Sequence, residues 1–175
     1  MNRKGFTLIE VLAVIVILAI LLVFTAPYII TAYEDSKLKS EEIFLERLSQ
    51  SIDSYVKLYS SDSDKMTFSE DGRAGKKHNS TEDGNEGETS YQVDIYKSEV
   101  SVKKIIEEKI ITENKYINPG NKEVSCNQNA KIEVYKDSQY VYCHKVKKES
   151  LGCLTNKYKS SIDSEYAIDT CIWSR

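Results

Sequence analysis

Residues 11–24 carry no polar atom in any side chain, and this run constrains the fold more than any other feature of the chain. The apolar character resumes after Thr25 and Pro27, so that the 25 residues from Phe6 to Ile30 are predominantly apolar. A helix needs about 20 such residues to cross the hydrocarbon core of a bilayer. The sequence therefore predicts that this segment enters a membrane.

Two residues inside the segment are unusual for a simple membrane anchor. Glu10 places a carboxylate where insertion costs at least about 2.5 kcal/mol, so we expect a partner that compensates its charge. Pro27 removes one backbone hydrogen bond and crowds the carbonyl group four residues before it. A kink or a loosening of the helix is therefore predicted just before Pro27.

The block KGFTLIE at residues 4–10, followed by an apolar stretch that contains Pro27, resembles the N-terminus of type IV pilins and pseudopilins. In that family a prepilin peptidase removes a short basic leader after the glycine, and the new first residue is methylated. The resemblance implies cleavage between Gly5 and Phe6 and methylation of Phe6. It also implies that Glu10 pairs with the amine of a neighbouring subunit during assembly, in which Pro27 would let the helix loosen.

Two simpler interpretations explain less of the N-terminus. A secretory signal peptide has a shorter apolar core, a cleavage site with small residues after it, and no acid inside. An ordinary signal anchor explains the basic Arg3 and Lys4, which hold the N-terminus in the cytoplasm. It explains neither Gly5 nor Glu10. We therefore expect a single-pass prepilin with its C-terminal domain outside the cell, and later in a fibre.

The helical period continues after the membrane segment. Apolar residues recur at steps of three and four, separated by charged residues and serines, at Leu45, Leu48, Ile52, Tyr55, Val56 and Tyr59. Neither Gly nor Pro occurs between residues 28 and 60. The sequence thus predicts one helix from Phe6 to Tyr59, about 80 Å long at 1.5 Å per residue. Its second half should pack on a domain.

Residues 61–90 contain four of the seven glycines and little that can be buried, which predicts an exposed, mobile loop. Its acidic residues do not have the spacing of an EF-hand calcium loop. We interpret them as solvated charges and expect no metal site; they are Asp62, Asp64, Asp83, Glu86 and Glu88.

The remaining chain predicts a small α+β domain. Residues 91–95 alternate weakly as a strand, and residues 101–117 have helical spacing that ends at a Pro-Gly turn. Residues 131–146 read as a hairpin that turns at Asp137-Ser138. The order resembles prepilins of low-GC Gram-positive bacteria. We expect a pilin-like α+β fold, with one long N-terminal helix packed on a small antiparallel sheet.

The expected organisation has five parts, namely a leader (1–5), a transmembrane and assembly half of the helix (6–30), its amphipathic half (31–60), a variable loop (61–90) and a globular domain (91–175).

All four cysteines lie in the last third of the chain, at Cys126, Cys143, Cys153 and Cys171. An even number in a small domain outside the membrane indicates two disulfides, for which three pairings exist. Because each would close a short loop, we favour Cys126 with Cys143 and Cys153 with Cys171. For the two histidines, His78 and His144, we expect solvated positions on the surface.

The sequence contains no motif of a nucleophile, base and orienting group, so we expect a structural protein without a cofactor rather than an enzyme. Removing the leader lowers the formal charge from −3 to −5, which argues against nucleic-acid binding. The one basic cluster is Lys145, Lys147 and Lys148.

The resemblance implies a subunit of a type IV pilus, major or minor. The implied partners are other pilin subunits, prepilin peptidase, an inner-membrane assembly platform and the membrane itself. A pseudopilin of a secretion or competence system, a DNA-uptake pilin and a membrane-anchored binding domain that does not polymerise remain as alternatives.

Overall fold

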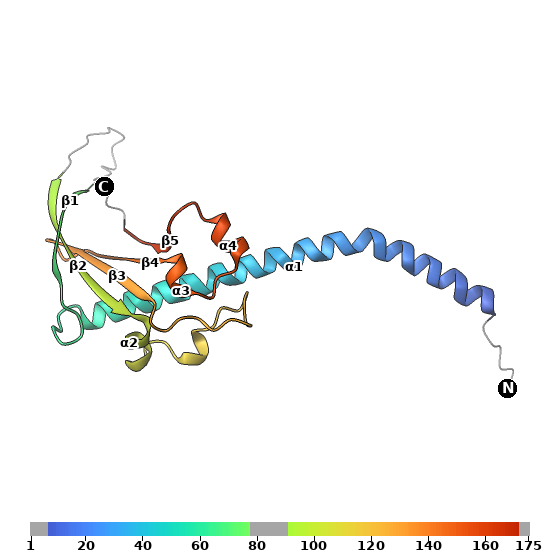
Figure 1. Cartoon of the computed structure of the whole chain (residues 1–175), viewed down its shortest axis with the longest axis horizontal. Coiled ribbons are helices and arrows are strands. Elements are labelled where there is room, and N and C mark those ends of the chain that lie inside the picture. The colour runs from blue at the N-terminus through green and yellow to red at the C-terminus, as the bar shows by residue number, and fades with distance from the viewer. Residues whose placement is uncertain (1–6, 78–90, 172–175) are drawn as a thin grey trace, which may run out of the picture.

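A computed structural model describes residues 7–77 and 91–171 and shows a long helix with a small domain wrapped around its C-terminal half (Figure 1). The long helix is α1 (Leu8–Tyr59). The strands are β1 (Ser69–Lys77), β2 (Tyr91–Ser101), β3 (Lys131–Asp137), β4 (Tyr142–Lys147) and β5 (Tyr166–Asp169). The short helices are α2 (Val102–Glu107), the 3₁₀ turn η1 (Glu113–Lys115), α3 (Lys148–Leu151) and α4 (Asn156–Ser161).

The predicted pilin-like α+β class is confirmed. The five strands lie in sequence order, and each pairs antiparallel with its neighbour. The predicted hairpin of β3 and β4 is present, with its turn at Ser138-Gln139 directly after Asp137, and Val134 lies opposite His144. Helix α2 and the turn η1 lie in the connection between β2 and β3. They cover one side of α1, while α4 lies on the other (Figure 1).

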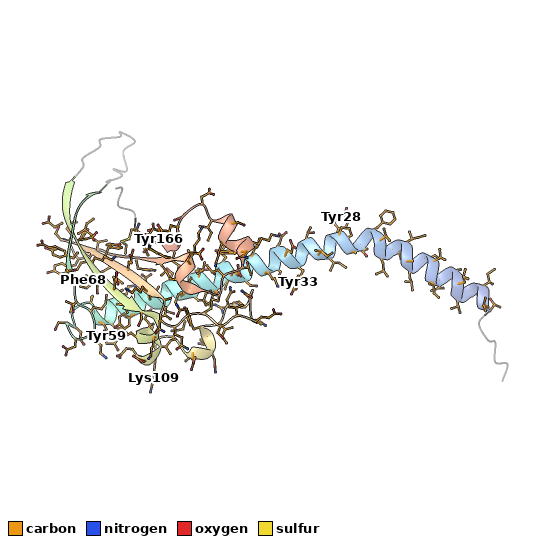
Figure 2. The ribbon with its side chains drawn as sticks, viewed as in Figure 1. Tyr28, Tyr33, Tyr59, Phe68, Lys109 and Tyr166 are labelled. Carbon is orange, nitrogen blue, oxygen red and sulfur yellow. A yellow bond between two sulfur atoms is a disulfide. The ribbon has the colours of Figure 1, made fainter. Side chains whose placement is uncertain are left out.

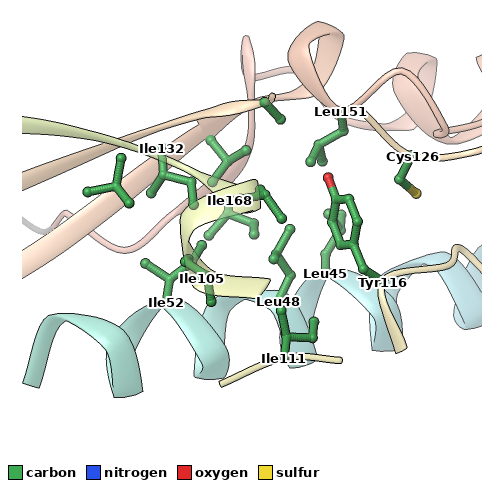
Figure 3. Close-up of a cluster of buried hydrophobic side chains, with 14 of the residues drawn as sticks. Leu45, Leu48, Ile52, Ile105, Ile111, Tyr116, Cys126, Ile132, Leu151 and Ile168 are labelled. Atoms are coloured by element: carbon green, nitrogen blue, oxygen red, sulfur yellow. The ribbon is translucent and has the colours of Figure 1, made fainter. Parts of the chain in front are cut away.

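The hydrophobic core lies between α1 and the inner face of the sheet (Figure 3). The apolar stripe predicted on α1 is buried there, except that Tyr59 is only partly buried. Leu48 and Ile52 are no more than 1% exposed and meet Ile105 of α2 and Ile132 of β3. Burying a side chain of this size contributes about 1.5–3 kcal/mol, so this stripe holds the domain on the helix.

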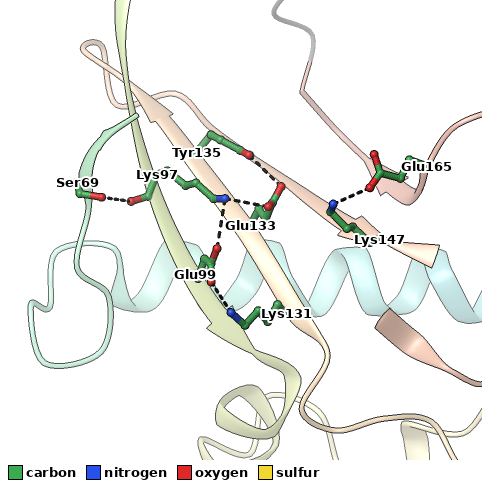
Figure 4. A network of polar contacts seen from close by, with 8 residues as sticks. All are labelled: Ser69, Lys97, Glu99, Lys131, Glu133, Tyr135, Lys147 and Glu165. Atoms are coloured by element: carbon green, nitrogen blue, oxygen red, sulfur yellow. Dashed lines mark hydrogen bonds and ion pairs between the residues drawn. The ribbon is translucent and has the colours of Figure 1, made fainter. Parts of the chain in front are cut away.

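The outer face of the sheet carries a network of ion pairs (Figure 4), beside a small apolar cluster of Ile95, Tyr135 and Cys143. Lys97 of β2 pairs with Glu133 of β3 at 2.8 Å and with Glu99 at 3.3 Å, and Lys131 reaches Glu99 at 3.1 Å. The hydroxyl of Tyr135 donates to Glu133 at 2.9 Å. These contacts join β2 to β3 on the solvent side, while the opposite face packs on α1.

The buried carboxylate of Glu41 binds the domain to α1, close to the point where the helix extends beyond the domain. Glu41 is 0% exposed, and its two oxygens accept hydrogen bonds of 3.0 Å from the side chain of Asn118, the amide of Thr155 and the hydroxyl of Thr155. Gly120 lies so close that a Cβ atom there would stand 2.6 Å from Cγ of Glu41 and 2.7 Å from the carbonyl oxygen of Lys37. This contact therefore requires glycine at position 120.

One sequence prediction about secondary structure is wrong, and another is confirmed only in part. Residues 69–77 were expected within a mobile loop, but they form β1, which pairs with β2 along most of its length. The backbone pairing outweighs the weak strand propensity of this segment. The short helix predicted within residues 101–117 is present as α2, but it ends at Glu107, well before the Pro-Gly turn, and Lys109 takes a left-handed conformation with φ 59°. Residues 78–90 lie outside the described residues.

The favoured disulfide pairing is also wrong. Cys126 bonds to Cys153, and Cys143 bonds to Cys171. The first bond joins the loop before β3 to the segment after α3, and the second joins β4 to the end of β5. Chain spacing misled the prediction, because β5 returns beside β4 and brings Cys171 next to Cys143.

Candidate assembly site

The N-terminal half of α1 is an apolar rod with nothing packed against it. Every residue from Leu8 to Lys37 is exposed, and Glu41 is the first residue of α1 that is buried (Figure 2). From Tyr33 on, α1 lies beside the domain, where Lys157 pairs with Glu34, whereas the 25 residues from Leu8 to Ala32, about 38 Å of helix, project from it. This part is long and apolar enough to span a membrane. Burying one large apolar side chain is favourable by about 1.5–3 kcal/mol relative to leaving it in water, so we expect lipid or protein around the rod.

The exposed rod begins with a capping box. The backbone N–H of Thr7 and its hydroxyl both donate to Oε2 of Glu10 at 3.0 Å, and the N–H of Glu10 donates to the Thr7 hydroxyl at 3.4 Å. These bonds satisfy N–H groups that a helix start otherwise leaves unpaired. In the single chain, the partner expected for Glu10 is therefore Thr7 at the start of the same helix. Its Oε1 accepts no hydrogen bond from the described residues.

Pro27 lies where the rod bends. Figures 1 and 2 show the change of direction close to Tyr28, the next residue. The ring of Pro27 removes the N–H that would bond four residues back. Two threonines nearby bond to backbone carbonyls, since Thr25 donates to Leu21 at 3.0 Å and Thr31 donates to Tyr28 at 3.0 Å. The predicted kink is therefore present.

The structure brings only part of the predicted site together. Glu10 and Pro27 lie on the same exposed helix, 17 positions apart, which is about 25 Å. Gly5 and Phe6, predicted to flank the cleavage site, lie outside the described residues. The four cysteines lie in the domain, away from this rod. Cleavage, methylation and the assembly role of Glu10 remain predictions.

The expectation that His144 is solvated is wrong. Its ring is 1% exposed, and it lies between α1 and β4. Nε2 is 2.9 Å from the hydroxyl of Ser49, and Nδ1 is 3.1 Å from a carboxylate oxygen of Asp53. Burial lowers the pKa of His144, and the carboxylates of Asp53 and Asp169 oppose that shift. The alternation of β4 was the available signal, because Val146 points inward two residues later.

Ser49, His144 and Asp53 have the hydrogen-bond order of a hydrolase triad but not its access. The buried ring lies beneath α1, so a substrate could not reach it beside the serine. The arrangement instead ties α1 to the sheet through side-chain hydrogen bonds. His78 lies outside the described residues.

The predicted basic cluster is already neutralised. Lys145 pairs with Asp169 at 2.8 Å, and Lys147 pairs with Glu165 at 2.6 Å. Lys148 donates to two backbone carbonyls near α4, at 3.0 and 3.1 Å. These partners leave little positive charge for a phosphate backbone.

The acidic residues considered for calcium are only partly described. Asp62 accepts the backbone N–H of Asp64 at 3.0 Å, which is a turn contact. The three other acids of that group lie outside the described residues. Among residues 7–77 and 91–171, no group of three histidine, cysteine or acidic side chains could hold a metal ion.

An exposed apolar helix joined to a disulfide-bonded antiparallel sheet is a pilin-like architecture, and the helix fits a membrane-anchored protein. Residues 1–26 match the family model described as the prokaryotic N-terminal methylation motif. The match supports a protein of the type IV pilin and prepilin family, and it points to a structural protein rather than an enzyme. No curated protein and no solved structure matches the chain.

Proposed function

We propose that the chain is a structural subunit of a type IV pilus that polymerises through the N-terminal half of α1. The observation that carries this proposal is the combination of the methylation motif with an apolar rod that no other part of the described chain covers. A membrane covers such a rod before assembly, and neighbouring copies of the rod would cover it in a fibre. The contact is heterologous and therefore propagates.

Processing would prepare the chain for assembly. Prepilin peptidase would cleave between Gly5 and Phe6 and leave Phe6 as the methylated first residue. The nitrogen of Thr7 stays an amide after this cleavage, so the capping box with Glu10 survives it. In the apolar fibre core, Oε1 of Glu10 would then accept the charged amine of a neighbouring subunit, where a charge pair is stronger than in water.

The proposal includes the predicted topology and partners. The N-terminus would face the cytoplasm and the domain would lie outside the cell, with the domain boundaries given by the sequence. The assembly platform and other pilin subunits would be the protein partners. A pseudopilin would share the rod and the motif, and the length of the fibre separates the two: a pilus extends from the cell, whereas a pseudopilus stays short.

The test replaces Glu10 with Ala in the full chain, in cells that express prepilin peptidase and the assembly machinery. We expect cleavage and membrane insertion to proceed, while the amount of chain in the sheared fibre fraction falls at least about tenfold, equivalent to 1.4 kcal/mol. Glu70→Ala is the matched control, because Glu70 is an exposed acid on β1. Normal incorporation of the Glu10→Ala chain would refute the role of Glu10.

A further inference from the structure

The half of α1 that packs on the domain has an acidic flank, formed by Asp35, Glu42 and Glu46. These residues recur at steps of seven and four, which places them on one side of the helix, and all three are exposed. Asp35 and Glu42 line a shallow depression together with Tyr158. Lys39 lines the same depression, so the flank keeps a net negative charge.

A basic groove lies on another side of the same helix, with a volume of about 970 Å³. Its cations are Arg47 of α1 and, from the segment that follows α2, Lys115 and Lys122. Phe44 and Ile117 supply apolar surface, and Ile117 is 48% exposed. Within the described ranges no carboxylate lines this groove, and none of the three cations has an ion-pair partner.

The centres of the two surfaces lie on different sides of α1, and the surfaces adjoin at Glu46, which accepts a hydrogen bond of 3.4 Å from Gln50 of the groove. Glu42 and Arg47 are five positions apart, which is about 140° around the helix at 3.6 residues per turn. Figure 1 shows the same separation, with α4 on one side of α1 and η1 on the other. Within the described ranges, Asp35 and Glu42 therefore do not line the basic groove of their own chain.

We propose that these surfaces are the two halves of one contact between copies of this chain, in which the acidic flank of one copy lies in the basic groove of the next. The inference rests on the proposed function, since a fibre requires a contact with two different halves. The two surfaces lie outside the apolar rod, so they give the domains of neighbouring copies a contact of their own.

Charge and length both favour a second copy as the occupant. Opposite charges across a contact attract and exclude wrong partners, whereas a twofold pairing of either surface with itself would oppose like charges. The acidic flank extends over residues 35–46, about 16 Å of helix, and the groove extends over residues 44–54 of α1, about 15 Å. Copies inserted into one membrane in the same direction have parallel helices, so the two lengths can lie side by side.

A charge swap in the full chain tests the contact. One variant carries Asp35→Lys and Glu42→Lys, a second carries Lys115→Glu and Lys122→Glu, and a third carries all four substitutions. In cells with the assembly machinery, we expect each double variant to lower sheared fibre at least about tenfold, because like charges then meet. The fourfold variant restores fibre to within about threefold of the wild type, because the attraction is re-formed.

Three controls separate a failure of this contact from a failure of processing or of assembly. Glu70→Lys reverses an exposed charge on β1 and should leave the fibre yield unchanged. Intact mass of the membrane fraction shows that every variant is cleaved. A wild-type chain that is cleaved but forms no fibre refutes the proposed function before any variant is compared.

Two results would overturn the inference while leaving the proposed function intact. Double variants that form as much fibre as the wild type would show that the two surfaces do not meet. Loss of fibre in both double variants without recovery in the fourfold variant would show that the groove binds some other acidic partner, or that the substitutions act on the fold.

Discussion

Replacing Glu41 tests how the domain is fixed to α1. In Glu41→Ala the side chain of Asn118 and the amide and hydroxyl of Thr155 lose their acceptor. The hydroxyl can rotate to another acceptor, but the other two donors remain in a site where Glu41 is fully buried. An unsatisfied buried donor costs about 1–3 kcal/mol and the deleted side chain adds a cavity, so we expect a loss of about 3–5 kcal/mol.

Glu41→Gln is the matched variant. Its oxygen can accept from Asn118 and from the amide of Thr155, and its NH₂ group can donate to the hydroxyl of Thr155. All three contacts are therefore kept while the negative charge is removed. Because desolvation offsets much of what a buried charge contributes, we expect this variant to stay within about 1 kcal/mol of the wild type.

The assay is urea unfolding of the full chain in detergent micelles, followed by near-ultraviolet circular dichroism of the tyrosines. With a slope of about 2 kcal/mol per molar urea, Glu41→Ala should move the midpoint down by about 2 M. The reasoning is refuted if Ala is as mild as Gln, because the hydrogen bonds would then contribute nothing. It is also refuted if Gln is as severe as Ala, because the charge would then be essential.

Three further predictions concern the domain. The double variant Cys126→Ser and Cys153→Ser should lose about 3.5 kcal/mol in the same assay, because the bond closes a loop over a separation of 27 residues; no change in midpoint would contradict this. Since burial lowers the pKa of His144, the unfolded chain binds a proton more readily, and stability should fall as the pH drops below about 6.5. His144→Gln should flatten this dependence of stability on pH, and an unchanged dependence would show that another group titrates. Asp53→Asn should steepen it, because Asp53 favours the protonated ring. Gly120→Ala should destabilise the domain by about 1–3 kcal/mol, measured by the same midpoint, and a neutral result would mean that α1 yields at this contact.

Features with a strong local pattern could be predicted from the sequence. The stripe that includes Leu48 and Ile52 has a helical period, and the hairpin of β3 and β4 has alternating residues and turn-favouring residues at Asp137-Ser138. The processing motif was equally readable, because a glycine, an aromatic residue and the acid Glu10 coincide at fixed spacing before an apolar run.

Features that depend on distant partners could not be predicted. Strand β1 forms because β2 offers it an edge, although its own residues, SEDGRAGKK, favour a loop. The disulfide of Cys143 and Cys171 depends on where β5 returns, which local spacing does not specify. Glu41 and His144 are polar residues whose burial becomes favourable only when partners from other elements reach them.

The central claim is that this chain is a processed pilin subunit, and intact mass of the protein recovered from sheared fibres tests it most directly. We predict a chain that begins at Phe6 and carries one added methyl group. Recovery of only the uncut chain beginning at Met1, in cells whose prepilin peptidase is shown to be active, would contradict it.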